Sequence, residues 1–201
     1  MEANTNKDTS RASLLDAALE QLWTKGYNGT RVDEIIENTA FTKGAFYHHF
    51  PSKKALVAAI IEETIGSVME YRWLEPLEKA DDPFAAIIAR LNEVRHDGDE
   101  GIRRGCILNN LAQELSHTDE ELRDLLNRKF GKWISGFAQA IAASQAKGQV
   151  RADVDPDKLA TYIVASYEGA VSLAKAARSA DTLNIVLDHL IAHLETLRTP
   201  H

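Results

Sequence analysis

The sequence predicts an all-α protein of about nine helices, and two observations support this. Apolar residues recur at intervals of three and four along most of the 201 residues, whereas no segment alternates as a half-buried strand does. Helix starts are also marked, because Asp82-Pro83 and Asp155-Pro156 each place an N-cap residue before a proline at the first helical position. The pattern favours small N-terminal helices followed by a larger helical body.

Four helices are expected at the N-terminal end. The first spans about residues 9–25 and stops at a Lys-Gly pair, a common C-terminal signal. Thr30 is the expected N-cap of the second helix, and Thr42 is the expected N-cap of a short third helix that Pro51 ends. A long fourth helix is expected to begin at Ser52.

The remaining helices are expected after residue 82. The sequence TDEE at 118–121 has the form of a capping box with acidic residues in the first turn, and Lys147-Gly148 closes the long helix that follows it. Two further segments with wide apolar faces begin at Pro156 and Leu183. They complete the expected body.

The composition is that of an ordinary soluble globular protein, with 44% apolar and 26% charged residues. No apolar run approaches the roughly 18 residues of a membrane span. Cys106 is the only cysteine, which excludes an internal disulfide and a cysteine-built zinc site. We therefore expect a cytoplasmic protein without a membrane partner.

The net charge of −7 argues at first against a nucleic-acid partner, but the charge is unevenly distributed. Residues 1–55 hold seven Lys or Arg and seven Asp or Glu, so the acidic excess lies entirely in the rest of the chain. Residues 38–61 contain three lysines and no acidic residue. A local positive patch of this kind is sufficient for contact with phosphates.

The stretch FTKGAFYHHFPSKKAL at 41–56 has two faces when its central residues are placed on a helix. One face is mostly apolar and suits a core: Ala45, Phe46, His49 and Phe50. The other carries a cation, a bare backbone, a phenol and an imidazole: Lys43, Gly44, Tyr47 and His48. Glycine inside a helix costs about 1 kcal/mol relative to alanine, so its presence suggests that a partner approaches closely.

A short helix, a turn and a second helix with such a face predict a helix-turn-helix motif, whose second helix enters the DNA major groove. Lys43 can reach guanine or a phosphate, Gly44 allows close approach, and Tyr47 can donate to phosphate oxygens. Helix N-termini and a lysine at the start of the fourth helix add further contacts. The expected DNA-binding residues are Thr30, Thr42, Lys43, Gly44, Tyr47, His48 and Lys53.

The segment TRVDEIIENTAFTKGAFYHHFPSKKAL resembles the DNA-binding domain of TetR-type transcriptional regulators, over about residues 9–57. The matching positions are Thr42, Lys43, Gly44, Tyr47, His49, Phe50, Ser52, Lys53 and Leu56. Ala45 departs from the pattern, because many members carry Ser or Thr there. The resemblance implies a helix-turn-helix domain at 9–55 and an effector-binding and dimerisation domain at 56–198.

The resemblance also implies a homodimer joined through the last two helices. Wide apolar faces on both helices are compatible with a four-helix interface, with internal packing of a monomer as the alternative. The expected interface residues are Ile163, Tyr167, Ala170, Val171 and Ala174 on one helix, and Val186, Leu187, Leu190, Leu194 and Leu197 on the other.

The segment RRGCILNNLAQELSHTDEEL at 103–122 has Arg-Gly-Cys, Asn-Leu and Glu-Leu elements. They resemble a subset of TetR-type regulators that includes repressors responsive to electrophiles and to acrylate-like molecules. Cys106 is then a candidate sensor, with Arg103, Arg104 and a helix start near 102–106 favouring its thiolate; packing as a small buried residue is the alternative. Candidates for an effector cavity, with plain core as the alternative for each, are Tyr71, Trp73, Trp133, Phe137 and Tyr167.

These features together predict a ligand-responsive repressor that a small-molecule effector releases from a palindromic operator in double-stranded DNA. An activator or dual regulator uses the same contacts, and a helical small-molecule-binding protein without DNA binding is the alternative of a different class. No motif for catalysis is present, so neither enzyme activity nor a cofactor is expected. His189 and His193 have a metal-binding spacing but lack a third ligand, so no metal site is predicted.

Overall fold

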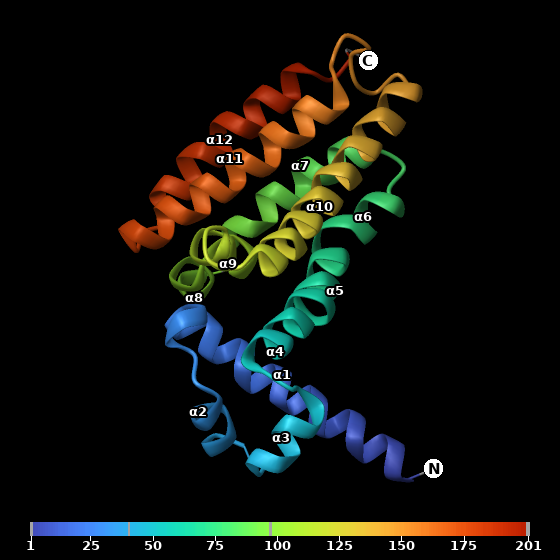
Figure 1. Cartoon of the computed structure of the whole chain (residues 1–201). Helices are drawn as coiled ribbons and strands as arrows, with labels where there is room; N and C mark the ends of the chain where they lie inside the picture. The colour runs from blue at the N-terminus through green and yellow to red at the C-terminus, as the bar shows by residue number, and fades with distance from the viewer. Residues whose placement is uncertain (1, 40, 97, 200–201) are drawn as a thin grey trace. The chain divides into compact units, whose positions relative to one another are not determined.

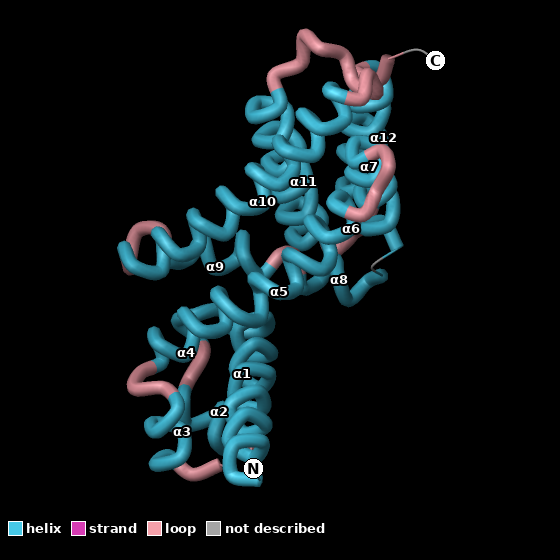
Figure 2. Tube along the Cα trace, turned by 90° about the vertical axis from the view of Figure 1, so that its right-hand side faces the viewer, coloured by secondary structure: helices cyan, strands magenta, loops and turns pink. Residues whose placement is uncertain are grey.

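The computed structural model describes residues 2–39, 41–96 and 98–199. Within these ranges the backbone is helical between its loops, with no strand and one isolated bridge between Val150 and Arg198 (Figure 2). The predicted all-α fold class is confirmed. In the described residues no helix is long and apolar enough to span a membrane.

The chain divides into two compact units. The N-terminal unit comprises Met1–Ser67 and the later segment Ile107–Asn127, and the C-terminal unit comprises Val68–Cys106 and Arg128–His201. The chain thus passes from the C-terminal unit into the N-terminal unit at residue 107 and passes back after residue 127. The domain bounds of 9–55 and 56–198 remain a prediction, because contact-based units and functional domains are different divisions.

The N-terminal unit contains the first helices of Figure 1 and the returning segment. Its elements are α1 (Glu2–Gly29), α2 (Val32–Glu37), α3 (Lys43–His49), α4 (Lys53–Ala59), the π-helical η1 (Ile60–Ile65) and α9 (Ile107–Leu115). α1 is broken at Gly26, whose φ of 69° lies in the left-handed region that favours glycine. The predicted helix end at the Lys-Gly pair is therefore confirmed.

Local capping explains where these helices begin. The Thr42 and Ser52 side chains accept hydrogen bonds from the Ala45 and Ala55 amides at 3.2 and 3.0 Å, as predicted. The prediction for Thr30 was wrong, because Arg31 is the N-cap of α2 and makes no side-chain cap. The Thr30 hydroxyl instead donates to a backbone carbonyl in the preceding turn.

The core of the N-terminal unit anchors the helix-turn-helix. Its fully buried side chains come from α1, α2, α3 and α4, and also from η1, α9 and the start of α10; the first four helices contribute Leu14, Leu22, Ile35, Phe46 and Leu56. Burial of each such side chain contributes roughly 1.5–3 kcal/mol. Packing of this kind is necessary because a helix as short as α3 is not stable alone in water.

The C-terminal unit is larger. Its elements are η2 (Glu70–Leu74), α6 (Glu75–Glu78), α7 (Pro83–Glu93), the 3-10 turn η3 (Val94–His96), α8 (Gly98–Arg104), α11 (Pro156–Ala177) and α12 (Asp181–Thr196). α5 (Gly66–Met69) and α10 (Glu120–Ala146) each have residues in both units. The predicted caps Asp82 and Asp155 are confirmed, since both side chains accept from the first turns of α7 and α11. α10 begins one residue later than predicted, with the Asp119 carboxylate accepting from the Leu122 amide at 3.1 Å.

α11 and α12 lie side by side (Figure 1) and share a core within one chain. Most residues expected at a dimer interface are buried there: Ile163, Ala170, Val171, Ala174, Leu187, Leu190, Leu194 and Leu197. Tyr167 and Val186 pack against the same core. In the single chain, these residues therefore pack against one another inside the C-terminal unit, as the alternative to a dimer interface predicts.

Candidate DNA-binding face and effector site

α3 separates its two kinds of side chain as the spacing predicts. Phe46 and Phe50 are buried, with 0% and 2% of their surface exposed, and their ring centroids lie 6.1 Å apart. Ala45 and His49 are half-buried beside them. The side chains of Lys43, Tyr47 and His48 are exposed, Tyr47 by 52%. The buried phenylalanines thus fix the direction in which the polar face projects.

Gly44 has no internal steric reason to be glycine. A Cβ built at this position meets only the Thr42 hydroxyl oxygen within 4 Å, at 3.9 Å. Its backbone has no left-handed φ. Alanine would fit here and would favour the helix, so packing among the described residues does not explain the glycine.

The Lys43 side chain is exposed and forms one ion pair at the surface. Its ammonium lies 2.8 Å from a carboxylate oxygen of Asp33, and more than 60% of each side chain is exposed. The hydrogen bond to Asp33 raises the pKa of Lys43 above its ordinary value. An exposed pair of this kind is weak and screened by salt, and a phosphate or base edge can therefore replace Asp33.

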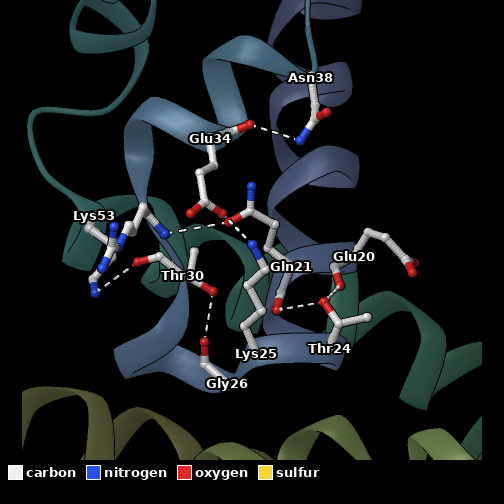
Figure 3. A network of polar contacts seen from close by, with 10 residues as sticks. Glu20, Gln21, Thr24, Lys25, Gly26, Thr30, Glu34, Asn38 and Lys53 are labelled. Carbon is white, nitrogen blue, oxygen red and sulfur yellow. Dashed lines mark hydrogen bonds and ion pairs between the residues drawn. The ribbon is translucent and has the colours of Figure 1, made fainter.

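Two of the predicted DNA-binding residues have other roles in the structure (Figure 3). Thr30 is only 1% exposed, and its hydroxyl donates to the Gly26 carbonyl at 2.7 Å. The Lys53 ammonium donates to the carbonyls of Tyr27 and Thr30 at 3.0 and 3.2 Å. Both residues stabilise the turn between α1 and α2. The exposed set that remains from the prediction is Thr42, Lys43, Gly44, Tyr47 and His48.

In the C-terminal unit, four of the predicted effector residues form one aromatic cluster. Trp73 of η2 lies 4.8 Å from Trp133 and 4.9 Å from Tyr167, between ring centroids, and Phe137 lies 6.0 Å from Trp73. Tyr71 does not join them, because 72% of its surface is exposed. It lies two residues before Trp73, and on a helix that spacing turns it to a different face.

Arg90, which the sequence analysis did not select, lies beside this cluster. Its guanidinium carbon is 5.3 Å from the Trp73 ring centroid. Among the described residues, no atom accepts a hydrogen bond from its buried Nε and Nη2 or from Trp133 Nε1. Such buried donors normally have an acceptor. One arginine on an amphipathic helix gives no sequence signal, so its position emerges only from the packing.

A separate pocket of about 460 Å³ lies over the other faces of η2, α6 and α10. Leu74, Leu77 and Ala140 give it an apolar lining, and Lys132 and Gln139 contribute polar groups. None of the predicted effector residues lines it. Among the described residues, no group of three or more His, Cys, Asp or Glu side chains has the arrangement of a metal site.

Cys106 is half-buried and packs against the core of the C-terminal unit. It lies between α8 and α9, after Gly105 with a φ of 67°, so the helix that begins here starts at Ile107 rather than at 102–106. Arg103 and Arg104 both pair with Glu100, at 3.0 and 2.5 Å. That single carboxylate balances only one of their two positive charges.

A helix-turn-helix presenting a cationic, glycine-containing face on an all-helical chain defines a DNA-binding transcriptional regulator rather than an enzyme. Comparison with known proteins agrees. Residues 14–60 match the model of bacterial regulatory proteins of the tetR family, and residues 84–190 match the tetracyclin repressor-like C-terminal domain. The chain belongs to the TetR family of transcriptional regulators.

Similar proteins share nearly the whole chain. The HTH-type transcriptional repressor DhaR of Mycobacterium sp. (strain GP1) is 31% identical over 198 residues, 93% of this chain and 95% of DhaR. The transcriptional regulator AcuR of Cereibacter sphaeroides is 35% identical over 178 residues, 86% of this chain and 79% of AcuR. The crystal structure of the regulatory protein TetR from Rhodobacter sphaeroides has 31% identity and a TM-score of 0.82, covering 92% of this chain and 98% of that one.

Proposed function

We propose that this regulator is a cytoplasmic homodimeric repressor that binds a palindromic operator and leaves it when a small-molecule effector binds. The exposed face of α3 carries the proposal, because Gly44 has no steric reason within the described residues to be glycine, and a phosphate can replace Asp33 as the partner of Lys43. The name of DhaR, a repressor similar over nearly its whole length, supports repression.

On DNA, each exposed residue of α3 has a distinct role. Lys43 contacts guanine or a phosphate at the N-terminal end of the recognition helix, and Gly44 lets the backbone approach. Tyr47 and His48 donate hydrogen bonds to phosphate oxygens, and the N-terminal amides beside Thr42 add to them. Thr30 and Lys53 act indirectly, by fixing the turn that carries α2 and α3.

The dimer is proposed to form through the outer faces of α11 and α12. α11 leaves Tyr162 and Leu173 exposed by 50% and 59%, and α12 leaves Ile185 exposed by 59%. Gly169 lies on the same side of α11 as Tyr162 and Leu173, with nothing within 4 Å of a Cβ built there. Two copies joined in this way place two recognition helices on one duplex, with half-sites about 34 Å apart.

For the effector, the aromatic cluster in the C-terminal unit is the proposed site. Trp73, Trp133, Phe137 and Tyr167 provide flat apolar surfaces, and the Arg90 and Trp133 N–H groups are donor-only. A suitable effector is therefore a small, partly apolar molecule with a carbonyl, carboxylate or other oxygen acceptor. Tyr71 is excluded from this site by its exposure.

Cys106 remains a second candidate for signal recognition, in keeping with the resemblance to electrophile-responsive regulators. Its half-buried position before α9 favours packing, whereas the resemblance of the Arg-Gly-Cys element favours a sensing role. Mass spectrometry after mild electrophile treatment, beside a Cys106→Ser variant, decides between them. An unmodified thiol with an intact effector response excludes the sensor.

The operator is found by sequencing the DNA fragments that co-purify with the protein. We expect enrichment of a palindrome whose half-site centres are about one helical turn apart, and binding of that palindrome in a gel shift. Absence of an enriched palindrome, together with salt-insensitive binding, would contradict the proposal and favour a helical small-molecule carrier.

The effector site is tested with a thermal-shift screen of small carbonyl- and carboxylate-bearing compounds. Compounds that stabilise the wild type should lose their effect with Trp133→Phe, which removes one buried N–H donor, and keep it with Gln139→Ala in the separate pocket. The opposite result would move the effector site to that pocket.

A further inference from the structure

Glu114, in the Glu-Leu element of the 103–122 segment, makes an unusual contact in the N-terminal unit. Its carboxylate oxygen Oε2 accepts the Tyr27 amide at 2.6 Å, and Oε1 accepts the Asn28 amide at 2.7 Å. One side chain of α9 thus holds two consecutive amides that lie 87 and 86 residues earlier in the chain. Charge-assisted bonds of this length are among the stronger hydrogen bonds in proteins.

The shape of the chain at Gly26 is adapted to this contact. Its left-handed φ of 69° turns the following amides away from the α1 ladder. A Cβ at Gly26 would lie 2.7 Å from Glu114 Oε2, closer than real Cβ contacts allow. The left-handed φ favours glycine here, and a Cβ would displace the Glu114 carboxylate from its place beside the turn.

Residues 26–30, which we call the α1–α2 turn, are held from two further directions. The Thr30 hydroxyl donates back to the Gly26 carbonyl, and Lys53 of α4 donates to the carbonyls of Tyr27 and Thr30 (Figure 3). The Lys53 ammonium also lies 4.4 Å from the Tyr27 ring centroid. Two helices thus bind the turn through different groups. Glu114 of α9 accepts hydrogen bonds from its amides, and Lys53 of α4 donates to its carbonyls.

α9 is itself firmly placed. Leu108, Leu111 and Leu115 are buried at a helical spacing and are at most 2% exposed. The helix starts one residue after Cys106, where the chain passes from the C-terminal unit into the N-terminal unit. A displacement of α9 along or about its axis would therefore change the two hydrogen bonds between Glu114 and the α1–α2 turn, which directly precedes α2.

We propose that Glu114 is a positioning residue for DNA binding: its carboxylate fixes the α1–α2 turn, and through it the recognition helix, in the operator-binding position. This inference rests on the proposed function and assigns the link between the α9 segment and the DNA-binding face. Glutamate is suited to it because two convergent amides need two acceptor oxygens, which glutamine, with one oxygen and an NH₂ donor, does not provide.

The test is Glu114→Gln, which keeps the shape and removes one acceptor and the charge. Glu121→Gln is the matched control, because Glu121 is an acid of the same segment that pairs with Lys54 and not with the turn. Each protein is titrated with its operator and with non-operator DNA, and amide exchange at Tyr27 and Asn28 is measured without DNA. Thermal unfolding checks that both variants fold.

We expect Glu114→Gln to weaken operator binding about tenfold relative to Glu121→Gln, a change of about one lost charge-assisted bond. Non-operator binding should be equal in the two variants, and exchange at Tyr27 and Asn28 should accelerate only in Glu114→Gln. Loss of a negative charge alone would strengthen DNA binding, so a weaker complex cannot come from charge.

Equal operator affinity of the two variants, with unchanged exchange at Tyr27 and Asn28, would overturn the proposal. If the wild type binds no DNA, the proposed function fails instead. The exchange rates then still show whether Glu114 holds the turn, so the two failures are distinguishable.

Discussion

At the residue scale, the polar side of α3 is determined by its apolar side. Phe46 and Phe50 are buried by the other N-terminal helices, which leaves Lys43 and Tyr47 no position except at the surface. Tyr47 keeps contact with this core through its ring, whose centroid lies 5.2 Å from that of Phe46 at an edge-on angle of 85°. Its hydroxyl group therefore projects from a fixed base.

A conservative substitution tests the Tyr47 hydroxyl. Tyr47→Phe keeps the ring contact and removes only the donor, so fold and dimer should be unchanged while operator affinity falls by about three- to tenfold, as for one lost hydrogen bond. Tyr71→Phe is the control, because Tyr71 is also exposed, by 72%, and lies in the C-terminal unit. Fluorescence anisotropy with labelled operator gives both values. Equal affinity of the two variants would remove Tyr47 from the contact set.

Two glycines of α10 offer a second comparison between single residues. A Cβ at Gly136 would lie 2.5 Å from Leu74 Cδ2, whereas a Cβ at Gly131 meets nothing within 4 Å. Gly131→Ala should raise the free energy of unfolding by about 0.5–1 kcal/mol through helix propensity. Gly136→Ala should be less stable than Gly131→Ala by about 1–3 kcal/mol, because the helix must shift or Leu74 must change rotamer. Denaturant unfolding measures both, and equal stabilities would contradict the close packing.

At the element scale, the start of α10 is held by charge as well as by capping. The Lys54 ammonium of α4 lies 2.8 Å from carboxylate oxygens of both Asp119 and Glu121. The hydrogen bond from Lys54, with that from the Leu122 amide, lowers the pKa of Asp119. Lys53 and Lys54 thus connect α4 to two different segments, the α1–α2 turn and the start of α10.

This pair makes a defined contribution to acid stability. Because the pKa of Asp119 is lowered on folding, its contribution is complete above the ordinary aspartate pKa of about 4 and is lost as pH falls through the lowered value. Asp119→Asn keeps a capping oxygen but removes the charge, so its unfolding free energy should depend less steeply on pH below about 4. Parallel curves for wild type and Asp119→Asn in urea unfolding at several pH values would exclude the ion pair as a cause.

These elements show what the sequence predicts and what it does not. The two faces of α3 follow from helical spacing. The caps follow from local residue types: Thr42 and Ser52 are favoured at helix starts, and Asp82 precedes a proline at the first helical position. Thr30 was misplaced because its hydroxyl donates back to the Gly26 carbonyl, four residues earlier, instead of capping the helix that follows. Glu114 was not selected because its partners lie nearly ninety residues away, and no local pattern records such a contact.

At the scale of the whole molecule, the proposed function requires two copies of the DNA-binding face. Most of the residues expected at the dimer interface are buried in the contact between α11 and α12 within one chain. The exposed residues Tyr162, Leu173 and Ile185 occupy the outer sides of the same helices and are available for a second copy. The proposed interface therefore uses the same two helices but different faces of them.

A charge on this outer face tests the dimer. The double variant Leu173→Arg/Ile185→Arg should be monomeric in sedimentation at micromolar concentration and should bind the palindrome at least about a hundredfold more weakly, since two linked half-sites are no longer engaged. Val68→Arg is the control, because Val68 is a similarly exposed apolar residue of the C-terminal unit, at 51%. A double variant that stays dimeric would place the interface elsewhere.

The proposed function depends on contact between the cationic end of α3 and DNA, and substitution of Lys43 measures that contact. Operator affinity is measured for wild type, Lys43→Ala and Lys79→Ala between about 50 and 200 mM salt. Lys79 is a matched lysine, exposed and paired with Glu75 at 2.9 Å. The account predicts steep salt dependence, a loss of about tenfold or more for Lys43→Ala, and no loss for Lys79→Ala. Three indistinguishable curves would contradict it.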